Sequence, residues 1–359
     1  MSAAPESHSA RYFALLYASA AQRPVLEALF GIEREVFDSL RAGLDHHVAH
    51  SRLQWWREEC ERAAGGRAVH PLTRGLVSAL RREAGLAGAM SGSPALAAPG
   101  SPARAAAASL ARPESALSAP SAAEPTTQQE AVALPQLAGL CGIVDVAVWD
   151  LAGATFETRR ELDAYCQRWA AGMIEPLIAS SASTTSAAAA PAAASVAATT
   201  ASTPGATAAA AVAPGASTTR TAGWRALGAA MREVELLADF AREAHFGRIR
   251  VPLDELESAN VNINALSKPP WPDAVAQLLR ARHKSLRNDI ARILDNVDRE
   301  EQPALRGLLV WAALTWRSSH RAECALPNRL QPGRFDAISD AWFAWRIARR
   351  ATIGRFRVN

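Results

Sequence analysis

Three carboxylate side chains recur at intervals of four residues in the segment LGAAMREVELLADFAREAHFGRIRVP. On a helix, Glu235, Asp239 and Glu243 lie on one stripe, and carboxylate oxygens are the ligands that Mg2+ prefers. The same spacing also fits a solvated acidic face, whose repulsion Arg232 and Arg242 would offset. The spacing alone leaves both interpretations open.

A basic segment, WRIARRATIGRFR, occupies residues 345–357 near the end of the chain. It is amphipathic enough to contact an anionic membrane surface, and a solvated terminal helix is the alternative interpretation. We therefore keep peripheral membrane contact as an expectation.

The composition excludes several classes of protein. The chain has 359 residues, of which 49% are hydrophobic, and a net charge of +4 at pH 7. This mild excess comes without a nucleic-acid-binding motif, so we expect no nucleic acid partner. The first residues lack the basic and then apolar pattern of a secretion signal, and no run of about 18 apolar residues has transmembrane character. We expect a cytoplasmic protein, with the inner face of the membrane as a site of peripheral contact.

The periodicity of apolar residues predicts helices throughout the ordered parts of the chain. Leu162, Tyr165, Trp169 and Met173 recur at i+3 and i+4 in an expected helix over residues 158–178. No segment shows the alternation with a period of two that strands need. The sequence therefore predicts an all-α protein.

Two low-complexity tracts interrupt this helical pattern. Both are rich in Ala, Ser and Pro, the second also in Thr, and we expect them to be disordered insertions, at residues 87–134 and 179–223. The expected helical parts are residues 1–86, 135–178 and 224–359, which would form one bundle.

The acidic segment resembles the second aspartate-rich motif of the squalene/phytoene synthase family. That motif typically reads LGxAxQxxNxxRDxxxD and, after a short gap, GRxYLP. The matching residues are Leu227, Gly228, Ala230, Asp239, Glu243, Gly247, Arg248, Ile249 and Pro252. In contrast, Arg232 stands where the family has Gln, Glu235 where it has Asn, and Ala238 where it has Arg.

The N-terminal part resembles the same family. LEALFGIEREVFDSLRA is similar to the family's first motif, LxALYAFCRxxDDxxDE, with Arg34 and Asp38 retained. Phe37, Arg41 and Ala42 replace the remaining acidic positions. LQWWREECERAAGGRAVHPLTRGL is similar to the family's LxWWREELxxxxxGxxxHPVxxAL. The resemblance thus covers most of the ordered chain.

The resemblance implies an isoprenoid-synthase-type helical bundle with a central apolar cavity, closed at one end by the two acidic helices. In active members, Mg2+ draws off the diphosphate of a prenyl diphosphate, and two prenyl chains are joined head to head. The implied metal ligands are Asp38, Glu235, Asp239 and Glu243. The implied catalytic residues are Asp38, Asp239 and Glu243, and the implied diphosphate contacts are Arg34, Arg232 and Arg248.

A non-catalytic relative is the alternative that the same residues allow. The superfamily includes an assembly factor for mitochondrial respiratory complex I, so a member that binds a lipid or a protein partner has a precedent. The reduction of the first motif to Asp38 favours this alternative. The retained DxxxE and GRIRVP favour continued binding of a diphosphate.

Overall fold

The computed structural model describes residues 9–41, 43–91, 133–196, 214–266, 271–326 and 337–358, and every structural statement below concerns these residues. They form helices and no strand within those ranges, as the periodicity predicts. The α-helices are α1 (Ala10–Tyr17), α2 (Gln22–Phe37), α3 (His46–Ala64), α4 (Pro71–Ser91), α5 (Cys141–Leu151), α6 (Arg159–Val196), α7 (Pro214–Ala238), α8 (Phe240–His245), α9 (Leu253–Ser258), α10 (Asp273–Asp295), α11 (Gln302–Ala325) and α12 (Ala337–Thr352). Three short 3-10 turns are η1 (Asp38–Leu40), η2 (Pro135–Leu137) and η3 (Ile263–Leu266).

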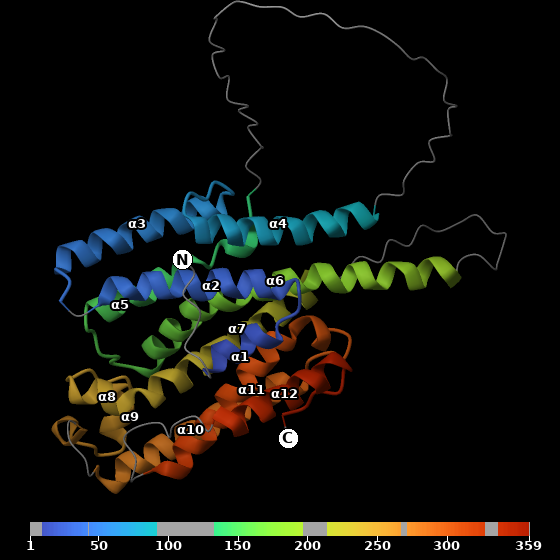
Figure 1. Cartoon of the computed structure of the whole chain (residues 1–359). Helices are drawn as coiled ribbons and strands as arrows, with labels where there is room; N and C mark the ends of the chain where they lie inside the picture. The colour runs from blue at the N-terminus through green and yellow to red at the C-terminus, as the bar shows by residue number, and fades with distance from the viewer. Residues whose placement is uncertain are drawn as a thin grey trace, which may run out of the picture.

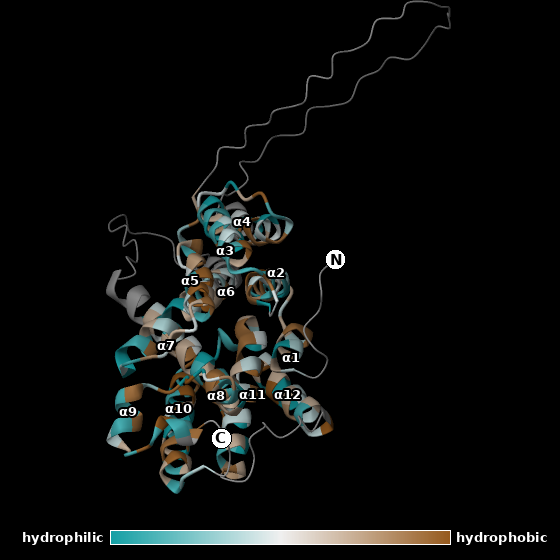
Figure 2. Ribbon diagram, turned by 90° about the vertical axis from the view of Figure 1, so that its left-hand side faces the viewer, coloured by the Kyte–Doolittle hydropathy of each residue, from teal (hydrophilic) through white to brown (hydrophobic). Residues whose placement is uncertain are grey.

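The helices stack in layers along the long direction of the molecule (Figure 1). Helices α3 and α4 form one end, α2, α5 and α6 lie next to them, and α10, α11 and α12 form the opposite end. Figure 2 views several of these helices nearly end-on. Helix α6 packs against α2, α4, α5, α7 and α11, so it is the centre of the bundle.

Local sequence explains where the helices begin. The Ser9 hydroxyl accepts a hydrogen bond from the backbone N–H of Tyr12 at 3.1 Å, and the Asp45 carboxylate accepts one from His47 at 2.8 Å. Both side chains satisfy N–H groups that a helix N-terminus leaves without partners. Pro303, which lacks an N–H, occupies the first turn of α11.

Small residues allow the central helices to approach closely. A Cβ atom on Gly142 of α5 would lie 2.9 Å from the carbonyl carbon of Arg168 on α6. A Cβ atom on Gly228 of α7 would lie 2.8 Å from the Cβ of Ala170, also on α6. These glycines therefore set the spacing of α5, α6 and α7.

The predicted apolar stripe of α6 faces the core. Leu162, Tyr165, Trp169 and Met173 are all at most 2% exposed, which confirms the burial that their spacing predicts. The expected continuous helix that carries the acidic stripe is instead interrupted at Asp239, between α7 and α8. The break is confined to Asp239, whose ψ is -3°. Its N–H still bonds to the Glu235 carbonyl, and its own carbonyl accepts a hydrogen bond from the N–H of Glu243.

Both helices that flank the second low-complexity tract extend into it. Helix α6 continues to Val196 and α7 begins at Pro214, whereas the sequence places the tract at residues 179–223. Alanine has the highest intrinsic helix propensity, which explains this extension. Most of the first tract and residues 197–213 of the second lie outside the described residues.

Candidate functional site

Arg11 joins three helices at the centre of the candidate site. Its Nη2 atom lies 3.1 Å from Glu33 Oε1 on α2 and 3.2 Å from both carboxylate oxygens of Glu235 on α7. Glu33 also accepts a hydrogen bond of 2.9 Å from the indole Nε1 of Trp169 on α6. Glu33 is 3% exposed, so this is a buried and paired charge. The first helix, which sequence reasoning gave no functional role, therefore supplies a cation that two carboxylates share.

Arg232 occupies the space between α7, α6 and the end of α2. Its Nη1 lies 3.1 Å from Glu235 Oε2, and its Nη2 donates to the hydroxyl of Tyr165 at 3.1 Å. The guanidinium also lies 5.4 to 5.8 Å from the ring centres of Phe37, Tyr165 and Trp169. An arginine held by three aromatic rings and a carboxylate is a fixed structural cation.

The charges of these arginines decide the protonation of Glu235. Burial by itself raises the pKa of this carboxyl group, but Arg11 and Arg232 outweigh burial and hold the pKa below its ordinary value. Glu235 is therefore an anion at neutral pH whose lone pairs face two guanidinium groups. This arrangement satisfies Glu235 without a metal ion.

A second ionic cluster adjoins the first through Tyr165. Arg250 Nη1 donates to Asp150 Oδ1 at 2.7 Å, and the Tyr165 hydroxyl donates to the same carboxylate at 3.1 Å. Arg250 Nη2 also lies 3.4 Å from Glu243 Oε2. The side chains of Arg250 and Asp150 are only 6% and 8% exposed. This cluster fixes the turn after α8 against α5 and α6.

Asp239 and Glu243 lie at the edge of these clusters and are paired as well. Asp239 Oδ2 is 2.9 Å from Arg242 Nη2, while Glu243 lies 3.7 Å from both Arg242 and Arg248. Burial raises the pKa of Asp239, and the nearby anions Glu243 and Glu235 add to this effect. The two carboxylates of the retained DxxxE pattern thus each face at least one guanidinium group.

The first acidic motif ends at the same end of the bundle. Asp38 is the first residue of η1 and forms an ion pair of 3.1 Å with Arg41, which stands at one of the missing acidic positions. Phe37, which replaces another, stacks below Arg232. Arg34 is exposed on α2. The structure therefore brings the end of α2 next to α7. The contact between them is made by Phe37 and Arg232 and not by acidic side chains.

As placed, these carboxylates do not fit a magnesium cluster. Asp38, Glu235, Asp239 and Glu243 are each within 3.5 Å of an arginine nitrogen. In the part of the chain that the structure describes, no group of three or more His, Cys, Asp or Glu side chains converges on a common point. Mg2+ needs oxygen ligands in nearly octahedral geometry, so each of these carboxylates would first have to turn away from its guanidinium partner. We therefore assign no magnesium-dependent step to these residues.

Aromatic rings pack in the middle of the bundle beside the ionic clusters. Trp311 of α11 makes edge-to-face contacts with Phe30, at 5.1 Å between ring centres, and with Trp169, at 6.0 Å. Arg11 lies over the rings of both Phe30 and Trp311. Trp311 and Trp169 are fully buried. The interior beside the ionic clusters is thus filled by apolar and aromatic side chains, and the expected central apolar cavity stays a prediction.

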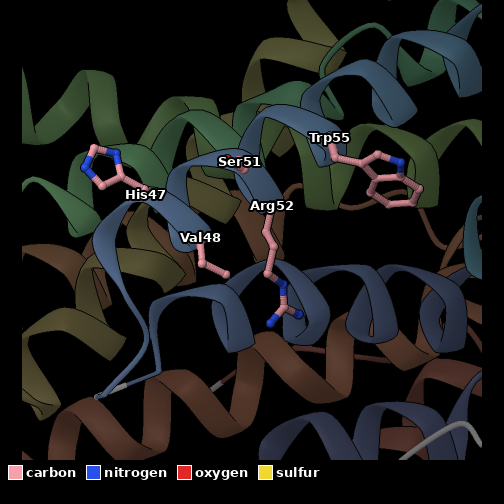
Figure 3. A pocket seen from close by; sticks show the side chains of 5 residues that line it. All are labelled: His47, Val48, Ser51, Arg52 and Trp55. Carbon is pink, nitrogen blue, oxygen red and sulfur yellow. The ribbon is translucent and has the colours of Figure 1, made fainter.

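Two surface hollows lie away from the ionic clusters. One, of about 370 Å³, is lined by side chains of α3 alone, as Figure 3 shows: His47, Val48, Ser51, Arg52 and Trp55. The other, of about 390 Å³, is lined by Arg57, Asp145, Val148, Trp149, Ala152, Ala154 and Arg168. Neither contains a residue that the acidic motifs predict as a site residue.

The chain matches the model of a known protein family. The family model of squalene/phytoene synthase matches residues 120–335, which is more than half of the chain. The chain belongs to the squalene/phytoene synthase family. No curated protein sequence matches the chain.

Solved structures of the family have the same fold. A dehydrosqualene synthase in complex with ligand superposes with a TM-score of 0.56 at 11% identity, over 94% of this chain and 90% of that one. The squalene synthase HpnC from Alicyclobacillus acidocaldarius superposes with a TM-score of 0.51 at 15% identity, over 89% of each chain. The expected all-α isoprenoid-synthase-type fold is confirmed.

The family match covers one of the two acidic motifs. The segment with Asp239 and Glu243 lies inside residues 120–335, whereas Arg34 and Asp38 precede them. The structural superpositions extend over the N-terminal helices as well. Membership therefore rests on the match over residues 120–335, which includes the second motif.

Sequence reasoning missed the buried partners of the acidic stripe. Arg250 takes the Tyr position of GRxYLP and is 5% exposed, whereas Arg248, which matches the motif, is about half exposed. Glu33 lies three residues after Phe30 on the apolar face of α2, and that position is a signal of burial. Arg11 carries no comparable signal, because its partner Glu235 is distant in the sequence.

Proposed function

We propose that this chain is a non-catalytic member of the squalene/phytoene synthase family that binds a prenyl diphosphate or another isoprenoid lipid without Mg2+. The observation that carries the proposal is the pairing of every candidate metal ligand with an arginine. Loss of a diphosphate in the family depends on metal ions held by both acidic motifs. Glu235 is held by two largely buried guanidinium groups, whereas the exposed ion pairs of Asp38 and Asp239 compete with a metal ion only weakly. With Glu235 held in this way, the site would bind such a cluster poorly.

Binding of the ligand is supported by exposed cations at the same end of the bundle. The side chains of Arg242 and Arg248 are 64% and 49% exposed, and each guanidinium group has further N–H donors besides those that face Asp239 and Glu243. A guanidinium group binds phosphate oxygens directly and often through two hydrogen bonds. The apolar and aromatic interior suits the hydrocarbon part of an isoprenoid. A protein partner, as for an assembly factor, is a second role that such a relative could have.

The test measures farnesyl diphosphate binding and diphosphate release by the full chain, with Mg2+ and with EDTA. We expect equal binding in both conditions and no release. Arg242→Ser combined with Arg248→Ser weakens binding by about thirtyfold or more, because each of the two phosphate contacts contributes about 1 kcal/mol or more.

Arg292→Ser is the matched control for Arg242→Ser. Arg292 is 66% exposed and pairs with Asp289 at i,i+3, and Arg242 is 64% exposed and pairs with Asp239 in the same way. Release that requires Mg2+ and disappears in Asp239→Ala would show an enzyme and overturn the non-catalytic assignment. Absence of binding in both conditions would overturn the assignment of the ligand and leave a protein partner as the alternative.

A further inference from the structure

Helix α12 presents an exposed hydrophobic stripe to solvent. Ile338, Trp342 and Trp345 are 84%, 57% and 45% exposed, and their spacing of four and three residues places them on one face. Ile353, directly after the helix, is also exposed. Single exposed hydrophobic side chains are normal on a protein surface. Two exposed tryptophans on one face of a short helix form a patch, and such a patch indicates an interaction surface.

The opposite face of α12 fixes the orientation of this stripe. Phe343, Ala344 and Ile347 are buried, and α12 packs mainly against α11. Asp340, the one acidic residue of α12, is fully buried and is bound by both Arg321 nitrogens at 2.6 and 2.7 Å. The helix cannot rotate to hide its tryptophans without breaking this buried ion pair.

Arginines surround the exposed stripe. Residues 337–358 contain five arginines and one acidic residue, the buried Asp340. The guanidinium of Arg346 lies 5.0 Å from the Trp342 ring centre, and that of Arg349 lies 5.5 Å from the Trp345 ring centre. Arg350 is exposed beside them. Aromatic rings and cations therefore occur at the same level on this surface.

We infer that this face of α12 is a docking surface for an anionic phospholipid membrane. Tryptophan side chains favour the headgroup region, because the indole ring is apolar and its N–H is polar. Arginines at the same level would contact lipid phosphates, and the negative potential of an anionic surface attracts them. In the described residues no helix is long and apolar enough to span a membrane, so the contact is peripheral. Figure 1 shows α12 on the side of the bundle away from α3 and α4, and the burial values show that its stripe is exposed there.

The proposal is independent of whether the ionic clusters bind a ligand. It assigns to α12 a contact that brings the bundle to the membrane. An acidic protein and a second copy of the chain are the alternative occupants of this face, and the test distinguishes them from lipid.

The experiment is co-sedimentation of the full chain with vesicles of phosphatidylcholine alone or with one third phosphatidylglycerol. We expect binding to the anionic vesicles, weakened by high salt, and little binding to phosphatidylcholine. Arg349→Glu with Arg350→Glu lowers the affinity at least about tenfold. Trp342→Ser with Trp345→Ser lowers the affinity for the anionic vesicles to a similar extent, because no indole rings remain to insert into the headgroup region.

A charge-matched control uses the α3 end of the molecule. Arg52→Glu with Arg67→Glu makes the same change in net charge at two exposed positions far from α12, and we expect less than a twofold effect. Trp55→Ser controls for the loss of an exposed tryptophan. Equal weakening by the two charge reversals, or equal binding to both kinds of vesicle, would overturn the proposal. Absence of binding to the anionic vesicles would overturn it as well. A dimer in size-exclusion chromatography that the α12 variants dissociate would then assign the face to a second copy of the chain, and a monomer would leave an acidic protein as its occupant.

Discussion

Arg232 shows how one side chain changes the chemistry of an inherited site. The family pattern has Gln at this position, which is neutral, whereas the arginine here brings a buried positive charge next to Glu235. The charge is compensated by the carboxylate, the Tyr165 hydroxyl and three aromatic rings. A cation that is so well compensated competes with any metal ion for the same carboxylate oxygens.

Replacing Arg232 by the family's residue should therefore destabilise the fold. Arg232→Gln leaves Glu235 with Arg11 alone and removes the contacts with the aromatic rings, so we expect the free energy of unfolding to fall by about 2 kcal/mol. Urea unfolding followed by circular dichroism measures the change. Arg242→Gln is the control on the neighbouring turn, because its side chain is 64% exposed, and we expect a loss below about 0.5 kcal/mol. Equal losses in the two variants would contradict a structural role for Arg232.

His283 predicts how stability depends on pH. It is 3% exposed between α10 and α11, with Nδ1 2.9 Å from the Ser319 hydroxyl oxygen. Burial, together with the charge of Arg287, lowers the pKa of His283 from 6.5 to about 4, and Glu323 opposes this only in part. Between these values the unfolded chain binds a proton that the folded chain does not. Burial of His283 therefore does not reduce the free energy of unfolding above pH 6.5, but it reduces this free energy progressively as the pH falls toward 4.

The expected size of this loss is about 3 kcal/mol, from a shift of more than two units. Unfolding in urea at a series of pH values measures how the free energy of unfolding depends on pH. Burial raises the pKa of Glu233 to about 7, which acts in the opposite direction over the same pH range, so the contribution of His283 is the difference between the unaltered chain and His283→Gln. His320→Gln is the control on α11, since His320 is 55% exposed and should leave the pH dependence unchanged. If the free energy of unfolding of His283→Gln depended on pH as that of the unaltered chain does, groups other than His283 would cause the dependence.

At the scale of the helices, the spacing of α5 and α6 depends on glycine. Gly142→Ala would place a methyl group 2.9 Å from the backbone carbonyl carbon of Arg168, and a backbone atom cannot move aside as a side chain can. We expect a loss of about 3 kcal/mol in the free energy of unfolding, since the two helices must separate. Thermal or urea unfolding detects the change.

Gly75→Ala is the matched control for this close approach. Gly75 lies within α4, is exposed, and has nothing within 4 Å of its added Cβ. Alanine there should stabilise the chain by about 0.5 to 1 kcal/mol, because it restricts the unfolded backbone and favours the helix. A similar loss in both variants would mean that the close contact of α5 and α6 has no special cost.

At the scale of the whole molecule, the sequence predicts burial better than it predicts ion pairs. The stripe that includes Tyr165 and Trp169 follows from the periodicity of α6, since apolar spacing is a local property. The ion pair of Arg11 with Glu235 joins residues on α1 and α7, and no local pattern contains that information. Arg250 illustrates the same limit, because the turn at Gly247, with a φ of 77°, decides which arginine of GRIRVP becomes buried.

The pairing of all candidate ligands predicts how the whole chain responds to Mg2+. A ligand that binds only the folded state raises the unfolding midpoint by mass action, so a metal ion that has no site leaves the midpoint unchanged. We expect no change when Mg2+ is added at constant ionic strength to the unaltered chain, measured by differential scanning fluorimetry. Arg232→Gln combined with Arg242→Gln removes one cation from each of Glu235 and Asp239, and this variant should respond more strongly to Mg2+. A saturating rise of the midpoint in the unaltered chain would show that the arginines yield to the metal, and the chain would then be expected to work as a metal-dependent enzyme after all.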